Sequence, residues 1–514
     1  MRSRRVVVLS FLLATLAASA CVPYRPFTLP PAELAKLPAK EQAKYRPSIS
    51  PCGEGLGAEA GQLAPDQCEL AIIEFDDQGE FWRPQQLDDT LKLISSSTFH
   101  DADHPQDPDR NQEALVVVFV HGWKNNASPD NEKKRNLGSF KKVLVRLALE
   151  EKRRATEEKA KGRPVVGVYL SWSGRTLNVP VLDNITYFGR KNAAERVARV
   201  SFSHAIYRII STVKGNRAKH RGNPKSVVAV VGHSFGGLIV ENTLLRSLTI
   251  ETNDFSEFAA DLVVLVNPAN EAILARQFVG ALKNAPPRVL ELEGHRISEP
   301  LIVSVRSQTD NATGIVFQMG NSLKGISKRM HRYHDEGPGL SSQWYYYTHT
   351  PGYTSEEAEL YSHHLVCPFS PQAPICERAP ETSAEYESKM RGQLEAMRRG
   401  KQKTIFPPPA IELGPCKRER EAASQLECIE RLSFIGATTG QVYTIDHDQE
   451  SANQTGYWIL QLPPTIVASH SDIFNSELAS LLSAFINLKD ANVVASPAES
   501  KAYLEGEAVT QQQQ

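Results

Sequence analysis

The sequence lacks an excess of charge of either sign. Its 514 residues include 58 Lys and Arg against 59 Asp and Glu, which gives a net charge of -1. A protein that holds the phosphates of a nucleic acid carries a surplus of basic residues, often gathered in one stretch. The totals contain neither such a surplus nor an acidic tail, so they argue against nucleic acid as a partner.

The sequence also lacks a long apolar run and an internal repeat. The N-terminal apolar stretch, Val6 to Ala18, is shorter than the roughly 20 residues that span a bilayer. No self-similarity recurs at the period of a solenoid. With 41% hydrophobic residues, 23% charged residues and a mean hydropathy of -0.34, the chain is typical of a globular protein with a sizeable core. Its length predicts one large domain with insertions, or two domains.

The first residues resemble a bacterial export signal. Three arginines within the first five residues precede the apolar stretch, which ends in Ala-Ser-Ala-Cys at residues 18–21. This ending resembles the bacterial lipobox. The resemblance implies a signal peptide over 1–20, lipidation of Cys21, and a protein anchored in the cell envelope, in the outer membrane facing the periplasm. The alternative is an ordinary signal peptide that leaves Cys21 as a thiol. Residues 21–66 are rich in Pro and Ala and predict a tether.

The remaining cysteines lack the spacing of a zinc site. None forms the C-x2-C pattern that structural zinc requires, so we expect no metal. Six cysteines in an exported chain favour disulfides instead, although many connectivities are open. Their grouping into three local pairs favours bonding within each pair: Cys52 with Cys68, Cys367 with Cys376, and Cys416 with Cys428.

Apolar runs recur along the chain and predict an α/β fold. Continuous Val, Ile and Leu mark strands that are covered on both faces, as in parallel sheets, and amphipathic helical stretches lie between them. The alternation predicts a doubly wound sheet. The expected strands are Leu70–Phe75, Leu115–Val120, Val165–Leu170, Val227–Val231, Leu262–Val266, Leu301–Val305 and Tyr457–Leu462, and the clearest helices are Leu137–Lys161, Gly237–Leu248 and Ser476–Leu488.

The rhythm of strand and helix breaks after about residue 320 and resumes near residue 456. We therefore expect a core over 67–320 and 456–490, interrupted by an insertion over 321–455 that could form a cap. The aromatic run Trp344 to Tyr347 lies in this insertion and predicts either the lining of an acyl or aromatic pocket or the insertion's own core. Residues 491–514 predict a disordered tail.

A glycine-rich turn joins an expected strand to an expected helix at residues 232–237. The segment Gly-His-Ser-Phe-Gly-Gly contains the G-x-S-x-G pattern, with Ser234 at its centre. Such a turn strains the backbone at the serine, and Gly232 and Gly236 leave room for the neighbouring strand and helix. A plain βα turn with a solvated serine is the alternative. A second loop, His121-Gly122-Trp123, follows the strand Leu115–Val120.

Together these features resemble the serine hydrolases of the α/β-hydrolase superfamily. The resemblance implies a doubly wound, mostly parallel α/β-hydrolase sheet with a large insertion before the last strand. It also implies that Ser234 is the nucleophile and that the backbone N–H groups of Trp123 and Phe235 form the oxyanion hole. Gly122 would let the backbone approach the substrate carbonyl, and His121 would orient the loop without transferring a proton.

The superfamily places an acid and then a histidine after the serine. Asp310 follows the strand Leu301–Val305 at its carboxyl end and resembles the acid, while a turn or helix cap is the alternative reading. Asn267 stands where some lipases carry theirs. His470, between the last strand and the last helix, resembles the base; His447 is the alternative, but it precedes that strand.

These residues predict a serine esterase that works through an acyl-enzyme and needs no cofactor. Its substrate would be a small-molecule or lipid ester, and its N-terminal anchor would hold it at a membrane. Two other classes stay open: an acyltransferase with the same three residues, and a non-catalytic binding protein on the cell surface.

Overall fold

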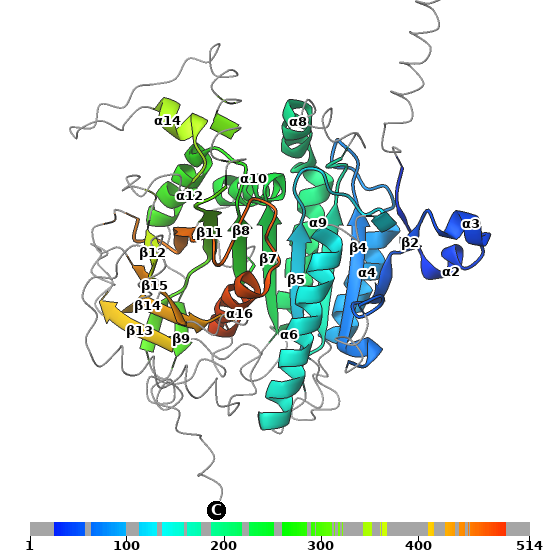
Figure 1. The fold of residues 1–514 in the computed structure, drawn as a ribbon, viewed down its shortest axis with the longest axis horizontal. Helices are drawn as coiled ribbons and strands as arrows, with labels where there is room; N and C mark the ends of the chain where they lie inside the picture. Colours follow the sequence, from blue (N-terminus) through cyan, green and yellow to red (C-terminus); the bar gives the residue numbers. More distant parts are fainter. Residues whose placement is uncertain are drawn as a thin grey trace, which may run out of the picture.

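A mostly parallel sheet with helices on both faces forms the larger part of the molecule (Figure 1). The computed structural model describes residues 25–56, 63–98, 113–130, 136–158, 162–175, 187–217, 226–250, 260–284, 289–292, 295–310, 313, 317–318, 321, 343–351, 360, 362–366, 410–415, 427–436, 442–447, 451 and 453–489. The predicted signal peptide, the Cys21 lipidation site, the proposed disulfide between Cys367 and Cys376, and the C-terminal tail lie outside the described residues.

The main sheet has eight strands in the order β16-β11-β8-β7-β5-β6-β4-β3. Neighbouring strands are parallel except β3, which runs antiparallel to β4. Every strand expected from an apolar run is present. The strands are β3 (Ile49–Pro51), β4 (Cys68–Glu74), β5 (Leu115–Val120), β6 (Val165–Ser171), β7 (Val227–His233), β8 (Leu262–Val266), β11 (Ile302–Ser307) and β16 (Tyr457–Leu462).

Two hydrophobic cores lie on the two faces of this sheet, which explains the continuous apolar runs. In β5, Val117 and Phe119 face one core while Val116 and Val118 face the other. The first core contains residues of α6 (Asn136–Glu158) and α16 (Ser476–Lys489). The second contains residues of α4 (Gln85–Ser97), α8 (Tyr187–Val197), α9 (Val200–Arg217), α10 (Phe235–Ile250) and α12 (Ala272–Asn284).

The strand order reverses at β5. This strand pairs with β6 on one side and with β7 on the other, and the helices that follow β5 and β7 pack on opposite faces of the sheet. In open α/β sheets, such a reversal opens a crevice at the carboxyl ends of the strands. The residues that follow β5 and β7 therefore lie at the place where this architecture forms sites.

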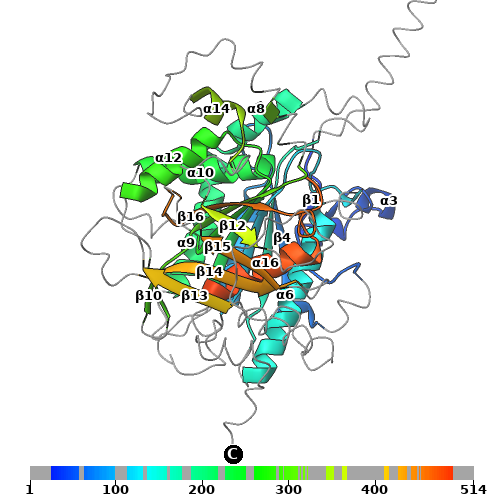
Figure 2. The same ribbon diagram turned by 60° about the vertical axis from the view of Figure 1, so that its left-hand side comes forward.

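A second sheet packs beside α16, and the sequence analysis missed it. Its order is β12-β15-β14-β10-β9, with β13 also paired to β14, and most of its pairs are antiparallel. The ribbons of β14 and β15 lie near α16 (Figures 1 and 2). Leu432 and Tyr443 of this sheet share a core with Phe485 of α16. The strands are β9 (Val289–Leu292), β10 (His295–Ser298), β12 (His363–Val366), β13 (Ala410–Pro415), β14 (Glu427–Ile435) and β15 (Val442–His447).

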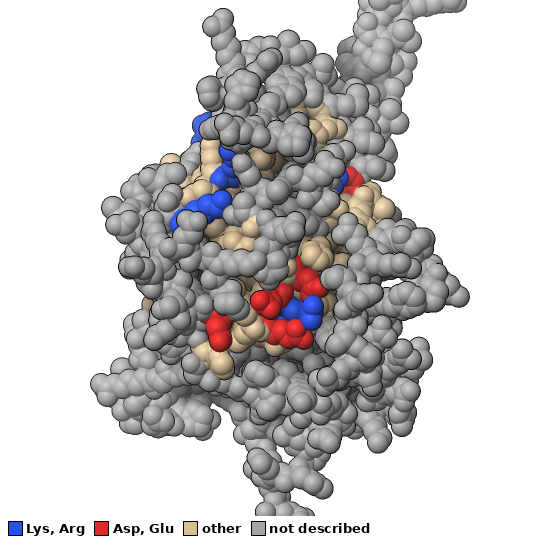
Figure 3. Space-filling view, turned by 90° about the vertical axis from the view of Figure 1, so that its left-hand side faces the viewer, with Lys and Arg blue, Asp and Glu red and all other residues tan. Residues whose placement is uncertain are grey.

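This sheet corrects the predicted boundary of the insertion. β9 and β10 come before residue 320, inside the expected core, yet β10 pairs with β14 from the expected insertion and β9 pairs with β10. The described strands pack against α16 and the edge strand β16, so they lie beside the main sheet. An antiparallel sheet alternates buried and exposed residues, and its signal differs from the strand and helix rhythm of the main sheet. Described acidic and basic side chains lie next to one another on this side (Figure 3).

The N-terminal segment 25–56 is packed against the main sheet, so the predicted tether is wrong for these residues. It forms β1 (Thr28–Leu29), α2 (Pro31–Leu34), α3 (Ala39–Gln42), β2 (Arg46–Pro47) and β3. The carboxylate of buried Glu74 accepts hydrogen bonds from the N–H groups of Phe27 and Thr28 at 2.9 Å each. A disulfide joins Cys52 to Cys68, as predicted. The composition of this segment resembles that of a linker. Composition could not predict the docking, because the contacts that hold the segment come from β4, which is distant in the sequence.

The aromatic run Trp344 to Tyr347 lies in α14 (Gln343–Thr348), beside α12. The side chain of Tyr346 is buried in the second core of the main sheet, and the Arg276 guanidinium lies over its ring at 4.9 Å. Tyr347 is also buried. Tyr346 therefore packs in the core of the main sheet, and not in a separate core of the insertion. Among the described helices, none has the length and apolarity to cross a membrane.

Candidate active site

Ser234 occupies the sharp turn between β7 and α10. Its φ of +55° lies in the left-handed region, which non-glycine residues rarely adopt. The Ser234 N–H donates to the Val266 carbonyl at 3.1 Å, which ties the turn to strand β8. A Cβ at Gly232 would lie 2.8 Å from Gly237 Cα, and one at Gly236 would collide with the Val120 carbonyl oxygen. Glycine at both positions therefore allows helix α10 to start directly against the strands.

Strained backbone conformations occur close together at the carboxyl ends of the central strands. In the described part of the chain, the non-glycine residues with positive φ are Lys124, Ser234 and Asn267, and each follows the carboxyl end of a central strand. Such conformations cost of order 1–3 kcal/mol each and persist only where the surroundings enforce them, often at functional sites. The clustering marks the ends of β5, β7 and β8 as one site.

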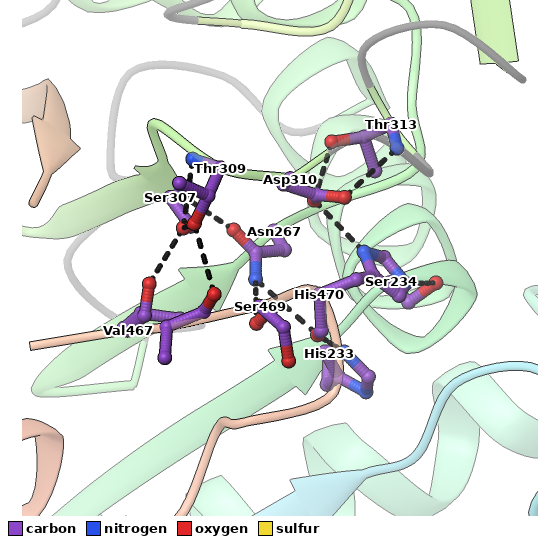
Figure 4. Close-up of polar contacts among 11 residues, drawn as sticks. His233, Ser234, Asn267, Ser307, Thr309, Asp310, Thr313, Val467, Ser469 and His470 are labelled. Carbon is purple, nitrogen blue, oxygen red and sulfur yellow. Dashed lines mark hydrogen bonds and ion pairs between the residues drawn. The ribbon is translucent and has the colours of Figure 1, made fainter. Parts of the chain in front are cut away.

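His470 stands between Ser234 and Asp310 (Figure 4). The Ser234 hydroxyl donates to His470 Nε2 at 2.9 Å, and His470 Nδ1 donates to Asp310 Oδ2 at 2.8 Å. Residues that are 236 and 160 positions away from His470 thus meet through one imidazole. The Asp310 side chain is fully buried, whereas that of His470 is 22% exposed, so the imidazole is the part of this chain of hydrogen bonds nearest to solvent.

The environment of Asp310 keeps its carboxylate ionised. Burial raises the pKa of this group, but hydrogen bonds from His470 and Thr313 and the charge of His470 outweigh that effect and lower the pKa to about 2. The Thr313 hydroxyl donates to Oδ2 at 2.5 Å, and its N–H donates to Oδ1 at 3.1 Å. An ionised acceptor at Nδ1 fixes the tautomer in which Nε2 is free to accept the serine proton.

The loop that carries His470 is held by side chains from the ends of β8 and β11. Asn267 Nδ2 donates to the His470 carbonyl at 3.3 Å, and its Oδ1 accepts from the Ser307 N–H at 2.7 Å. The Ser307 hydroxyl donates to the Val467 carbonyl at 2.6 Å, and the Thr309 hydroxyl donates to the Ala468 carbonyl at 2.9 Å. Asn267 stands where some lipases carry the acid. Its amide supports instead the loop of His470, the candidate base.

The loop after β5 lies directly against the serine. A Cβ on Gly122 would lie 2.7 Å from Ser234 Cβ, so only glycine lets the backbone come this close. His121 Nδ1 donates to the Gly122 carbonyl at 2.9 Å, and its Nε2 accepts from the Trp172 N–H at 3.1 Å. Burial lowers the pKa of His121 to about 4. Both ring nitrogens of this neutral imidazole are engaged by the main chain, which fits the predicted orienting role of His121 without proton transfer.

Aromatic rings flank the same loop. The rings of Trp123 and Phe235 lie 6.4 Å apart, and the Tyr187 ring at the start of α8 contacts both, at 5.4 and 5.2 Å. Because Phe235 opens helix α10, its N–H is one of those that have no partner within the helix. Sequence reasoning missed Tyr187, which has no recognisable motif around it.

Other predicted residues lie away from this site. His447 ends β15 in the second sheet, where its ring contacts His363 at 4.8 Å. Cys52 and Cys68 form their disulfide at the β3 edge of the main sheet. Cys428 is disulfide-bonded, and Cys416, its predicted partner, lies outside the described residues. Across the described ranges, no three His, Cys, Asp or Glu side chains form a group that could hold a metal ion.

Comparisons of the chain with protein-family models, with curated proteins and with solved structures gave no significant match.

Proposed function

We propose that this protein is a serine hydrolase of the α/β-hydrolase type that cleaves a carboxylic ester through an acyl-enzyme. The observation that carries the proposal is the hydrogen-bonded series Ser234, His470 and Asp310. A serine hydroxyl is a weak nucleophile on its own, and a neutral imidazole held by a carboxylate is the arrangement that activates it.

The sheet topology supports this assignment. β5 is the third strand of the main sheet in chain order, and α6 follows it. In α/β-hydrolases, the loop between the third strand and the next helix supplies one oxyanion N–H, and the residue after the nucleophile supplies the other. Here these residues are Trp123 and Phe235, and Gly122 lies against Ser234. Removing one such donor typically slows catalysis by about 10² to 10³.

The reaction then proceeds in two halves. Ser234 Oγ attacks the ester carbonyl carbon while His470 Nε2 takes its proton, and the N–H groups of Trp123 and Phe235 hold the negative oxygen. His470 returns the proton to the departing alcohol as the ester C–O bond breaks, which leaves the acyl group on Ser234. A water molecule then gives a proton to His470, attacks the acyl carbon and releases the acid, and Ser234 recovers its proton.

The direct test replaces the nucleophile. Ser234→Ala should lower kcat on p-nitrophenyl esters by up to about 10⁶-fold, because no hydroxyl remains to form the acyl-enzyme. Its unfolding temperature should stay near that of the wild type. Ser480→Ala, a buried serine on α16, serves as the control and should keep full activity. A fluorophosphonate should label the wild type and not Ser234→Ala; equal turnover in both proteins would overturn the proposal. A panel of rising acyl length would then define the substrate.

A further inference from the structure

His233, the residue immediately before Ser234, reaches the loop of the candidate base. Its Nε2 lies 2.8 Å from the carbonyl oxygen of His470, and the two imidazole rings are 5.0 Å apart. A carbonyl oxygen only accepts, so Nε2 carries the proton and donates. The residue next to the nucleophile thus holds the main chain of the residue that takes the nucleophile's proton.

The surroundings of His233 favour one fixed, neutral state. The side chain is buried, and Nδ1 has no hydrogen-bond partner in the part of the chain that the structure describes. A Cβ built on Gly122 would lie 3.0 Å from this nitrogen, so the ring also lies against the loop after β5. Burial and the neighbouring charge of His470 lower the pKa of His233 to about 3, although Asp310 raises it and His121 lowers it further.

Two donors therefore converge on one carbonyl. His233 ends β7 and Asn267 follows β8, and both side chains donate to the His470 oxygen from the strands on which the nucleophile's turn is built. His470 itself lies in a loop between β16 and α16, and the imidazole must stay within hydrogen-bond reach of Ser234 Oγ. A shift of about 1 Å in such a contact can cost roughly 10²-fold in rate.

We propose that His233 is a positioning residue, whose Nε2–H bond to the His470 carbonyl fixes the base relative to Ser234. The inference rests on the proposed function and adds to it a residue that transfers no proton and contacts no substrate. The donor of this bond is the residue next to the nucleophile. The bond therefore limits those movements of the β16–α16 loop that would separate His470 from Ser234.

Two substitutions of His233 by amide side chains of different length distinguish this positioning role from simple packing. In His233→Gln the amide nitrogen is as many bonds from Cα as Nε2 is in histidine, so it can reach the His470 carbonyl. In His233→Asn the amide is one bond shorter and cannot. We expect His233→Gln to keep kcat within about 3-fold of the wild type, and His233→Asn to lose about 10- to 100-fold in kcat with little change in KM. The rate of fluorophosphonate labelling of Ser234 should follow kcat.

Controls distinguish the failure of this inference from the failure of the proposed function. His363→Leu removes another buried imidazole, in the second sheet, and should leave kcat unchanged. If both amide variants matched the wild type, or lost activity equally while folded by thermal unfolding, the positioning role would be refuted. That outcome would leave the proposed function standing as long as Ser234→Ala is inactive. Turnover by Ser234→Ala would instead remove the basis of both.

Discussion

At the scale of single residues, the site depends on which nitrogen of each imidazole carries a proton. His470 donates from Nδ1 to Asp310, whereas His233 donates from Nε2 to a carbonyl. His121 donates from Nδ1 to the Gly122 carbonyl. These acceptors fix the Nδ1–H tautomer on His470 and His121 and the Nε2–H tautomer on His233. The same ring therefore makes a different set of contacts at each of the three positions.

Replacing the acid should leave the base in the wrong tautomer. In Asp310→Asn the amide can donate to Nδ1 and leave the proton on Nε2, so His470 could no longer accept from Ser234. By analogy with serine proteases we expect kcat to fall by about 10⁴-fold with little change in fold. Thr313→Val, which removes only one hydrogen bond to Asp310, should cost far less. Ester hydrolysis by the two purified variants measures the difference, and equal losses would contradict the tautomer argument.

The two buried neutral histidines make stability depend on pH. The pKa is about 4 for His121 and about 3 for His233, in both cases chiefly through burial, against 6.5 for an unperturbed histidine. Between pH 6.5 and 4, these two histidines bind protons in the unfolded chain but stay neutral in the folded protein. The free energy of unfolding should therefore fall as the pH drops through this window, by roughly 3 kcal/mol for His121 alone. Urea titrations at several pH values measure the slope, and a flat profile would contradict it.

At the scale of elements, the turn from β7 into α10 is constrained by the neighbouring strand β5. The carbonyls of Val120 and His121 occupy the space next to Gly236 that a side chain would need. Glycine at this position therefore serves the packing of a helix against a strand, while the positive φ falls on Ser234.

A methyl group at residue 236 tests that packing. Gly236→Ala should lower the free energy of unfolding by about 1–3 kcal/mol, because its Cβ would collide with backbone that cannot move freely. Gly215 in α9 offers a matched control, since a Cβ there meets nothing within 4 Å. Gly215→Ala should be neutral or stabilising. Thermal unfolding of the two variants gives the comparison, and similar melting temperatures would count against the packing argument.

The local sequence predicted every strand of the main sheet except β3, because the predicted strands are buried on both faces and β3 is not. The runs at Leu115–Val120, Leu262–Val266 and Tyr457–Leu462 match β5, β8 and β16 residue for residue. The strands of the second sheet escaped prediction because polar residues interrupt their apolar ones, so that β14 and β15 contain no continuous apolar run. In β14, Leu432 and Phe434 face the core, while Arg431, just before Leu432, pairs with Glu412 and Asp446.

At the scale of the whole molecule, segments from both ends of the chain complete the main sheet. The N-terminal segment adds β3 at one edge, and β16 forms the other edge next to β12 of the second sheet. Edge strands left open invite pairing with other chains. The pairing of β3 with β4 and the contact of β12 with β16 therefore cover strand edges that would otherwise be open.

The disulfide between Cys52 and Cys68 closes the N-terminal segment onto β4. It links residues 16 positions apart, and a loop of this size contributes about 3 kcal/mol in the chain-entropy description. The double variant Cys52→Ala/Cys68→Ala should lose a free energy of unfolding of that order and keep its activity, because the bond lies at the β3 edge of the sheet. Chemical denaturation with an esterase assay tests both halves, and an unchanged midpoint would show that the segment docks without the bond.

The sequence by itself determined the strands, the strained serine turn and the identity of the three residues that meet there. It could do so because burial on two faces and a glycine-flanked turn leave local signatures. Only the tertiary structure decided how the main chain of His470 is held, since His233 and Asn267 donate to its carbonyl from 237 and 203 positions away. The same holds for the docked N-terminal segment and for the pairing of β10 with β14, because the partner strands lie tens to more than a hundred residues away and leave no local pattern.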